Sequence, residues 1–135
     1  MNSGNELEIL QQKLRAYFQN SKSDDIISVY LFGSRIVGPH AEDSDLDIGI
    51  LMRAGYLLPN DTLFTLMEDI ATIVHPLVPD VKILNELPVR IQHNVLKNAQ
   101  QIYCADEIAD ADFREDLFQK YFELKPILQE FYDAL

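Results

Sequence analysis

Apolar residues recur at helical spacing in several parts of the chain. Near the start they follow the capping-box pattern Ser3-x-x-Glu6 and predict an amphipathic helix that ends at about Phe18 and covers a sheet. A second apolar stripe predicts a helix over 63–74. His75-Pro76 should end it, because the residue before a proline avoids helical geometry. A third helix is expected to follow Pro88, a residue suited to the first turn of a helix.

A helical pattern also fills the end of the chain, from about 110 to 135. Asp110 or Asp112 is expected to cap this helix, because a carboxylate can accept hydrogen bonds from the first turn. Pro126 is expected to kink or break it. The many large apolar residues in this segment favour either docking on the same domain or an interface with another molecule, and the sequence leaves both alternatives open.

Four apolar runs predict strands. The run Ile26–Phe32 is apolar on both faces, which is typical of a central strand. Further strands are expected at about Asp45–Met52 and Leu77–Leu84, with Asp80 near the start of the latter, and Gln101–Cys104 predicts a short edge strand. The predicted fold class is therefore α/β (α+β), a small mixed β-sheet flanked by helices.

Length and charge limit what this fold can do. The chain has 135 residues and no repeat or linker, so we expect one domain over 1–135 that ends in the helical segment at about 110–135. It carries 11 Lys and Arg against 22 Asp and Glu, a formal net charge of −11, which disfavours direct binding to nucleic acid. A partner is expected to be basic or to bring its own cations.

The sequence also suggests a compartment. Cys104 is the only cysteine, which excludes an intramolecular disulfide and fits a reducing cytoplasm. No apolar run approaches the roughly 20 residues that span a bilayer. We therefore expect a cytoplasmic protein that does not insert into a membrane.

The candidate chemistry lies where one strand ends and the next begins. Side chains alternate along a strand, so Asp45 and Asp47 should point to the same side while Leu46 and Ile48 point into a core. Two carboxylates in one small volume repel each other unless a cation lies between them. The pair therefore favours a hard divalent metal such as Mg²⁺.

Gly33-Ser34 adds a second element just upstream of this pair. A glycine after a strand lets the backbone turn sharply and approach a ligand, and backbone N–H groups there can face a phosphate. Arg35 is next to this proposed cradle and is either an anion contact or a member of a surface ion pair. Metal-binding carboxylates beside a phosphate cradle indicate phosphoryl or nucleotidyl transfer.

These motifs together resemble a known family. Gly33-Ser34, ten intervening residues and Asp45-x-Asp47 are similar to the signature of the DNA polymerase β-like nucleotidyltransferase superfamily. The short chain resembles its minimal branch, the MNT proteins, which are commonly the antitoxin half of HEPN/MNT toxin–antitoxin pairs. Asp80-Val81-Lys82-Ile83-Leu84 resembles the strand with the third carboxylate, and the segment 121–128 resembles the usual ending. An isolated Asp at a strand start is usually a turn residue, so the assignment of Asp80 depends on the upstream pair.

The resemblance implies a fold, a reaction and a set of roles. The fold would be that of the polymerase β-like nucleotidyltransferases. Asp45 and Asp47 would bind two Mg²⁺ ions, while Asp80 would bind one and help to draw the proton from the acceptor hydroxyl. Gly33 and Ser34, with Arg35 beside them, would hold the nucleotide through its β- and γ-phosphates.

The resemblance also suggests what accepts the nucleotide. ATP would be the substrate, and AMP would pass to a tyrosine hydroxyl of a HEPN ribonuclease toxin, which would neutralise the toxin. Two alternatives remain. The same scaffold occurs in enzymes that adenylylate antibiotics, and a non-catalytic antitoxin could act by occlusion alone.

Overall fold

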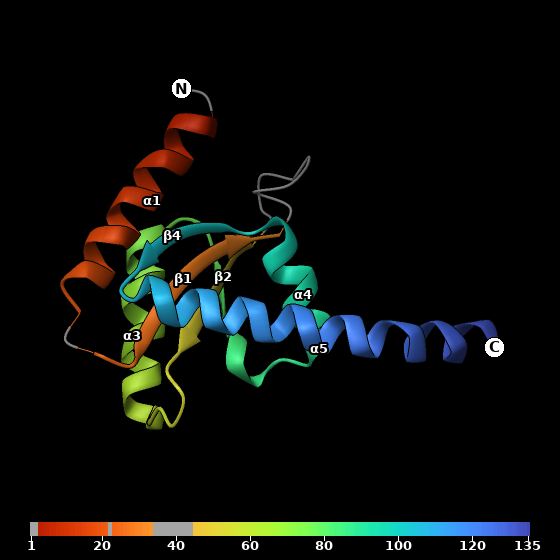
Figure 1. Ribbon diagram of the computed structural model, residues 1–135. Coiled ribbons are helices and arrows are strands. Elements are labelled where there is room, and N and C mark those ends of the chain that lie inside the picture. Colours follow the sequence, from red (N-terminus) through yellow and green to blue (C-terminus); the bar gives the residue numbers. More distant parts are fainter. Residues whose placement is uncertain (1–2, 22, 34–44) are drawn as a thin grey trace.

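A computed structural model describes residues 3–21, 23–33 and 45–135 (Figure 1). Ser34 and Arg35 lie outside the described residues. The chain forms α1 (Ser3–Gln19), β1 (Ile26–Phe32), β2 (Leu46–Met52), α3 (Asn60–Val74), β3 (Pro79–Ile83), the short 3₁₀ turn η1 (Leu84–Glu86), α4 (Val89–Asn98), β4 (Gln100–Cys104) and α5 (Glu107–Asp133).

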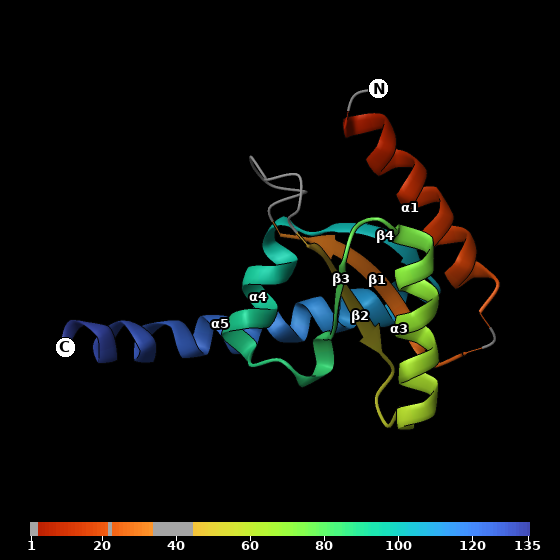
Figure 2. The same cartoon turned by 180° about the vertical axis from the view of Figure 1, so that it is seen from behind.

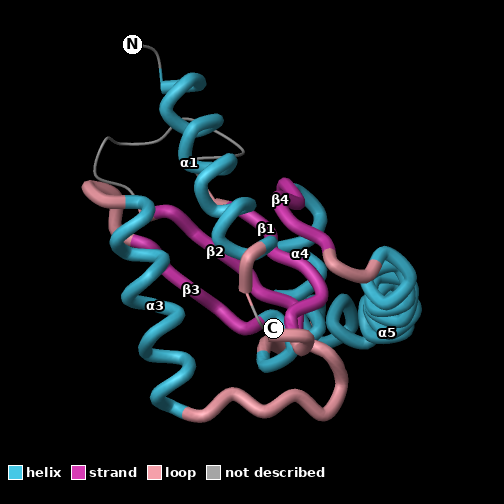
Figure 3. The backbone as a smooth tube through the Cα atoms, turned by 90° about the vertical axis from the view of Figure 1, so that its left-hand side faces the viewer, coloured by secondary structure: helices cyan, strands magenta, loops and turns pink. Residues whose placement is uncertain are grey.

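The four strands form one mixed sheet in the order β3-β2-β1-β4. β1 pairs antiparallel with both of its neighbours, and β2 pairs parallel with β3. The central position predicted for β1 and the edge position predicted for β4 are both confirmed. The expected fold class is confirmed as well, because helices flank this small mixed sheet (Figure 3).

Each face of the sheet is covered by a pair of helices. On one face, α1 and α3 pack against side chains of β1 and β2 such as Val29 and Ile48. On the other face, α4 and α5 pack against a second cluster that includes Tyr30 and Leu51. Because β1 is buried on both faces, it is apolar almost throughout, as a central strand must be.

The structure corrects the predicted course of the last helix. α5 begins at Glu107, three residues before the predicted cap, because the Asp106 side chain accepts a hydrogen bond of 3.0 Å from the Ala109 backbone N–H. The helix also continues through Pro126, where a kink or break was expected. A proline removes only one backbone hydrogen bond, and in this exposed stretch water can satisfy the carbonyl that loses its partner.

α5 extends well beyond the body formed by the sheet and the other helices (Figures 1 and 2). Its first half packs on the sheet, where Asp110 and Leu117 are buried. Its second half projects from the domain toward the C-terminus. None of the helices in the described part of the chain is long and apolar enough to cross a membrane.

Candidate active site

Gly33 directly follows β1 and lies against an acidic side chain of the neighbouring strand. Its φ of +87° falls in the left-handed region, a backbone conformation that glycine adopts readily. A Cβ atom at this position would lie only 2.0 Å from Oδ2 of Asp47. Glycine is therefore required at position 33 for two reasons: the backbone conformation is left-handed, and the Asp47 carboxylate occupies the space that a side chain would need.

Asp47 and Asp80 face each other across two parallel strands. They are direct register partners in the β2–β3 pair. The pKa of Asp47 is raised above its usual value, first by burial, then by the charge of Asp80 and a hydrogen bond with it, and then by the charge of Asp45. Ionisation of this carboxyl group is therefore less favourable than usual, and a nearby cation would offset this free-energy difference.

Asp45 immediately precedes β2, which begins at Leu46 close to the predicted start, and Asp45 is exposed to solvent. The expected alternation otherwise holds, since Leu46 and Ile48 are fully buried in the core. In the described part of the chain, no group of three His, Cys, Asp or Glu side chains is already placed as the ligands of a metal ion. The structure thus brings Asp47 and Asp80 together and leaves Asp45 at the solvent edge.

Lys82 is a part of this site that the sequence analysis did not single out. Its Nζ lies 3.6 Å from Oδ2 of Asp80, and the lysine charge partly offsets the raised pKa of Asp47. Both Lys82 and Asp80 have side chains 42% exposed, so the ion pair itself contributes little stability. The signal was present as Asp80-x-Lys82, because residues two apart in a strand share a face.

The family comparison covers this whole arrangement. The family described as "Polymerase beta, Nucleotidyltransferase" matches residues 12–108, most of the chain and all of the strands. The chain belongs to this polymerase β nucleotidyltransferase family. The matched part of the nucleotidyltransferase contains Gly33 and all three carboxylates described above, and it ends just after α5 begins.

Solved structures share its fold. A chain from a toxin–antitoxin complex crystallised with AMP-PNP is 21% identical, with a TM-score of 0.73 over 92% of this chain and 96% of that one. A chain from the complex of tri-AMPylated Shewanella oneidensis HEPN toxin with MNT antitoxin is 19% identical, with a TM-score of 0.69 over 94% and 96%. A structure described as a minimal nucleotidyltransferase is 22% identical, with a TM-score of 0.56 over 74% and 95%. No curated protein matched the chain.

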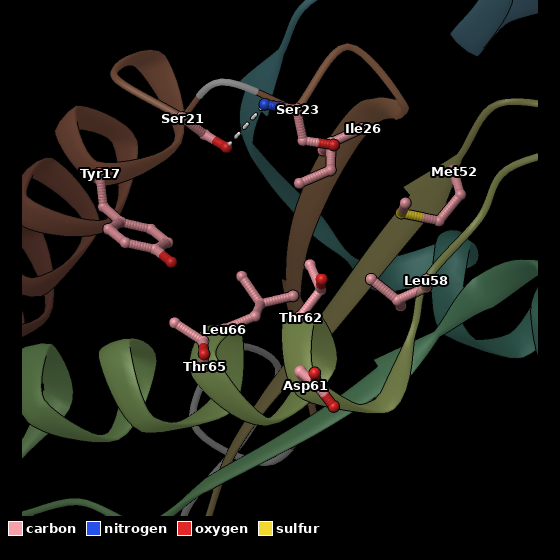
Figure 4. Close-up of a pocket in the computed structure, with 10 residues that line it drawn as sticks. All are labelled: Tyr17, Ser21, Ser23, Ile26, Met52, Leu58, Asp61, Thr62, Thr65 and Leu66. Atoms are coloured by element: carbon pink, nitrogen blue, oxygen red, sulfur yellow. Dashed lines mark hydrogen bonds between the residues drawn. The ribbon is translucent and has the colours of Figure 1, made fainter.

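A cavity of about 300 Å³ lies at the other end of the nucleotidyltransferase sheet (Figure 4). Its walls come from α1, β1, β2 and α3, and Tyr17, Ser21, Ser23, Ile26, Met52, Leu58, Asp61, Thr62, Thr65 and Leu66 line it. Ile26 pairs with Met52 at this end of the β1–β2 ladder, whereas Phe32 pairs with Asp47 at the other. At about 3.3 Å per residue the two ends are roughly 20 Å apart. The cavity is therefore separate from the carboxylate site.

Proposed function

We propose that this protein is a Mg²⁺-dependent nucleotidyltransferase antitoxin that transfers AMP from ATP to a tyrosine hydroxyl of a HEPN-type ribonuclease toxin and so neutralises it. The observation that carries the proposal is the register pairing of Asp47 with Asp80 directly beside the backbone of Gly33. This places two carboxylates next to the residue at which the proposed phosphate cradle begins.

The structural neighbours support the choice of nucleotide and partner. One was crystallised as a toxin–antitoxin with AMP-PNP, an analogue of ATP. Another contains a tri-AMPylated HEPN toxin bound to an MNT antitoxin. AMP added to a tyrosine near a ribonuclease site would obstruct RNA binding through its negative charge and its bulk.

The acidic residues fit Mg²⁺. Carboxylate oxygens are the ligands that this hard cation prefers, and burial first and then the charges of Asp80 and Asp45 raise the pKa of Asp47, which a nearby cation would counteract. Asp45, Asp47 and Asp80 would hold two ions. The bound metal would neutralise charge on the phosphates and on the attacking and leaving oxygens.

The residues of the chain have distinct tasks in this reaction. The tyrosine oxygen forms a bond to the α-phosphorus of ATP while the bond from that phosphorus to the bridging oxygen breaks and pyrophosphate leaves. Asp80 helps to draw the proton from the tyrosine hydroxyl. Gly33, with Ser34 and Arg35, holds the β- and γ-phosphates, and Lys82 adds a positive charge beside Asp80.

The rest of the chain favours a protein acceptor over a nucleic acid or a membrane. A net charge of −11 repels polynucleotide phosphates and attracts a basic protein partner. We expect the protein to act in the cytoplasm, where Cys104 stays reduced.

The metal requirement can be tested by calorimetry. ATP should bind appreciably in Mg²⁺ and only weakly in EDTA, because a triphosphate and three carboxylates otherwise repel each other. Equal affinity in the two buffers would contradict the metal assignment.

The acceptor can be tested by intact mass spectrometry. A HEPN-type toxin is incubated with ATP, Mg²⁺ and this protein, and adenylate-sized mass increments are expected on the toxin. Asp47→Asn should abolish them, whereas Asp61→Asn, at an exposed carboxylate lining the distant cavity, should not. An unmodified toxin whose ribonuclease activity is still blocked would favour inhibition by occlusion. An unmodified, active toxin together with adenylylation of an added aminoglycoside would favour the antibiotic reaction.

A further inference from the structure

The second half of α5 carries an apolar surface that the rest of the domain does not cover. In the described part of the chain, the large exposed apolar side chains are concentrated here more than anywhere else. They are Phe118, Phe122, Ile127, Phe131, Tyr132 and, just after the helix, Leu135. After Leu117, no residue of α5 is buried.

Six of the apolar residues from Leu117 to the end of the chain follow a heptad spacing, and the exposed side chains of Phe118, Phe122, Ile127 and Tyr132 lie outside that spacing. Leu117, Tyr121, Leu124, Leu128, Phe131 and Leu135 are separated alternately by four and three residues. This 4-3 alternation is the pattern with which one helix packs along another at a shallow angle. We call these six residues the α5 seam.

The exposure of the seam increases along the helix. Leu117 is only 3% exposed and belongs to the core cluster that α4 and α5 form on the sheet. The ring of Tyr121 stacks on His93 of α4, with ring centroids 3.6 Å apart. Phe131 is 61% exposed and Leu135 is 88% exposed. The seam thus begins as part of the domain core and continues beyond the domain (Figures 1 and 2).

Charge distinguishes between the possible occupants of the seam. α5 contains eight acidic and three basic residues, and two of the basic residues, Arg114 and Lys120, are already paired with Asp110 and Asp116. Two copies of a chain with a net charge of −11 would place acidic helices side by side. A second copy is therefore disfavoured, and a helix with basic flanks is favoured.

We propose that the α5 seam is the docking surface for a helix of a basic partner protein, whose apolar stripe packs along Leu124, Leu128, Phe131 and Leu135 while its Lys or Arg side chains face the acidic flanks of α5. The proposal rests on the proposed function for the identity of the partner, a HEPN-type toxin. It adds the part of this chain that holds that partner.

The test compares two matched double variants of the full-length protein. Phe131→Ser with Leu135→Ser removes the open end of the seam. Phe64→Ser with Leu57→Ser is the control, because these residues are 64% and 81% exposed but belong to α3 and the loop before it. Circular dichroism should show that both variants keep the helix content of the unaltered protein.

Affinity for the HEPN-type protein is measured by calorimetry without nucleotide. The seam variant should bind at least tenfold more weakly, the control should bind like the unaltered protein, and raising the salt concentration should weaken binding of the unaltered protein. Unchanged affinity of the seam variant would overturn the proposal. The proposal would also be overturned if sedimentation experiments showed that the unaltered protein self-associates and the seam variant does not, because a second copy would then occupy the seam.

AMP transfer to the partner is followed in the same samples by intact mass. Seam-dependent binding without any transfer by the unaltered protein would refute the proposed reaction and leave the docking surface supported. Transfer and binding that both persist in the seam variant would refute the docking surface and leave the proposed reaction supported.

Discussion

At the scale of single residues, Asp47 has the most constrained surroundings in the site. Its carboxylate fills the space where a side chain at position 33 would begin, and Asp80 faces it from the next strand. Burial and the two neighbouring carboxylates raise its pKa. These contacts fix the position of Asp47 at a cost in free energy that a bound cation would remove.

Gly33→Ala should disrupt the site more than the fold. A left-handed φ costs a non-glycine residue roughly 1–2 kcal/mol, and the new methyl group would also displace the Asp47 carboxylate. Gly55→Ala is the matched control, since Gly55 has a φ of +77° but nothing within 4 Å of its added Cβ. Denaturant unfolding should show a similar decrease in the free energy of unfolding for both variants, because both place a side chain on a left-handed backbone. Calorimetry should show loss of Mg²⁺–ATP binding in Gly33→Ala alone. Normal binding by that variant would contradict the placement of the nucleotide beside Gly33.

Asp47→Asn should abolish transfer and leave the metal-free protein at least as stable as the unaltered one. Because the pKa of Asp47 is raised in the folded state, its contribution to the free energy of unfolding is present at low pH and is lost as the pH rises through the raised pKa. The ionised, repelled carboxylate therefore destabilises the fold at neutral pH, and the amide removes that charge. Urea unfolding in EDTA at pH 7 measures this difference. A large loss of stability in the variant would favour a structural role for Asp47.

At the scale of elements, a buried polar network fixes α5 on the sheet. Ser28 Oγ donates to Asp110 Oδ1 over 2.7 Å, and the Tyr30 hydroxyl donates to the same oxygen. Arg114 Nε completes the network with a contact of 3.1 Å to Asp110 Oδ2 and one of 3.2 Å to the Tyr30 hydroxyl. A network with every member paired ties the first half of the helix to β1, the strand that directly precedes Gly33.

Tyr30→Phe should therefore destabilise the protein by about 1–3 kcal/mol, because it removes a donor from a buried carboxylate. Burial and the hydrogen bond to Asp110 raise the pKa of Tyr30 to about 12 from an ordinary value of 10.0. The stability that the protonated phenol supplies is complete below pH 10 and is lost as the pH rises from about 10 to about 12. Unfolding by denaturant across this range should show the difference between the unaltered protein and Tyr30→Phe shrinking. Tyr132→Phe, at an exposed position, should show a smaller effect at pH 7.

The same network shows which structural features could be predicted from the sequence and which could not. The strands and most helices were predictable because the period of the apolar residues records which faces are buried. The role of Asp110 was not predictable: it was expected to cap the last helix, but it lies buried inside α5, and Asp106 caps it. Ser28 and Tyr30 are polar positions two apart in an apolar strand, yet nothing local shows that their partner lies about 80 residues away.

The site divides in a similar way. Gly33 and Asp47 could be singled out from the strand end and strand start at which they lie, and Asp80 from the family resemblance; the structure places the three where β1 ends and β2 and β3 begin. The proximity of Lys82 to Asp80 was overlooked, although the alternation of a strand carries that information. The prediction for Ser34 and Arg35 lies outside the described residues.

At the scale of the whole molecule, the chain separates a carboxylate edge from an extended apolar helix. The sheet presents Asp47 and Asp80 where β1 ends and β2 and β3 begin, while α5 projects from the domain (Figures 1 and 2). A small protein with a net charge of −11 repels the phosphates of a polynucleotide. A protein acceptor, docked on the domain, is the acceptor that this architecture favours.

The central claim is that the site transfers a nucleotide from ATP to the toxin. The most direct test incubates this protein and the HEPN-type protein with Mg²⁺ and ATP labelled either at the α-phosphorus or at the γ-phosphorus. Label from the α-phosphorus alone should become attached to the toxin, in step with the release of pyrophosphate, and Asp47→Asn should prevent this attachment. Attachment of label from the γ-phosphorus, or of no label at all, would show that this site does not transfer AMP to the toxin.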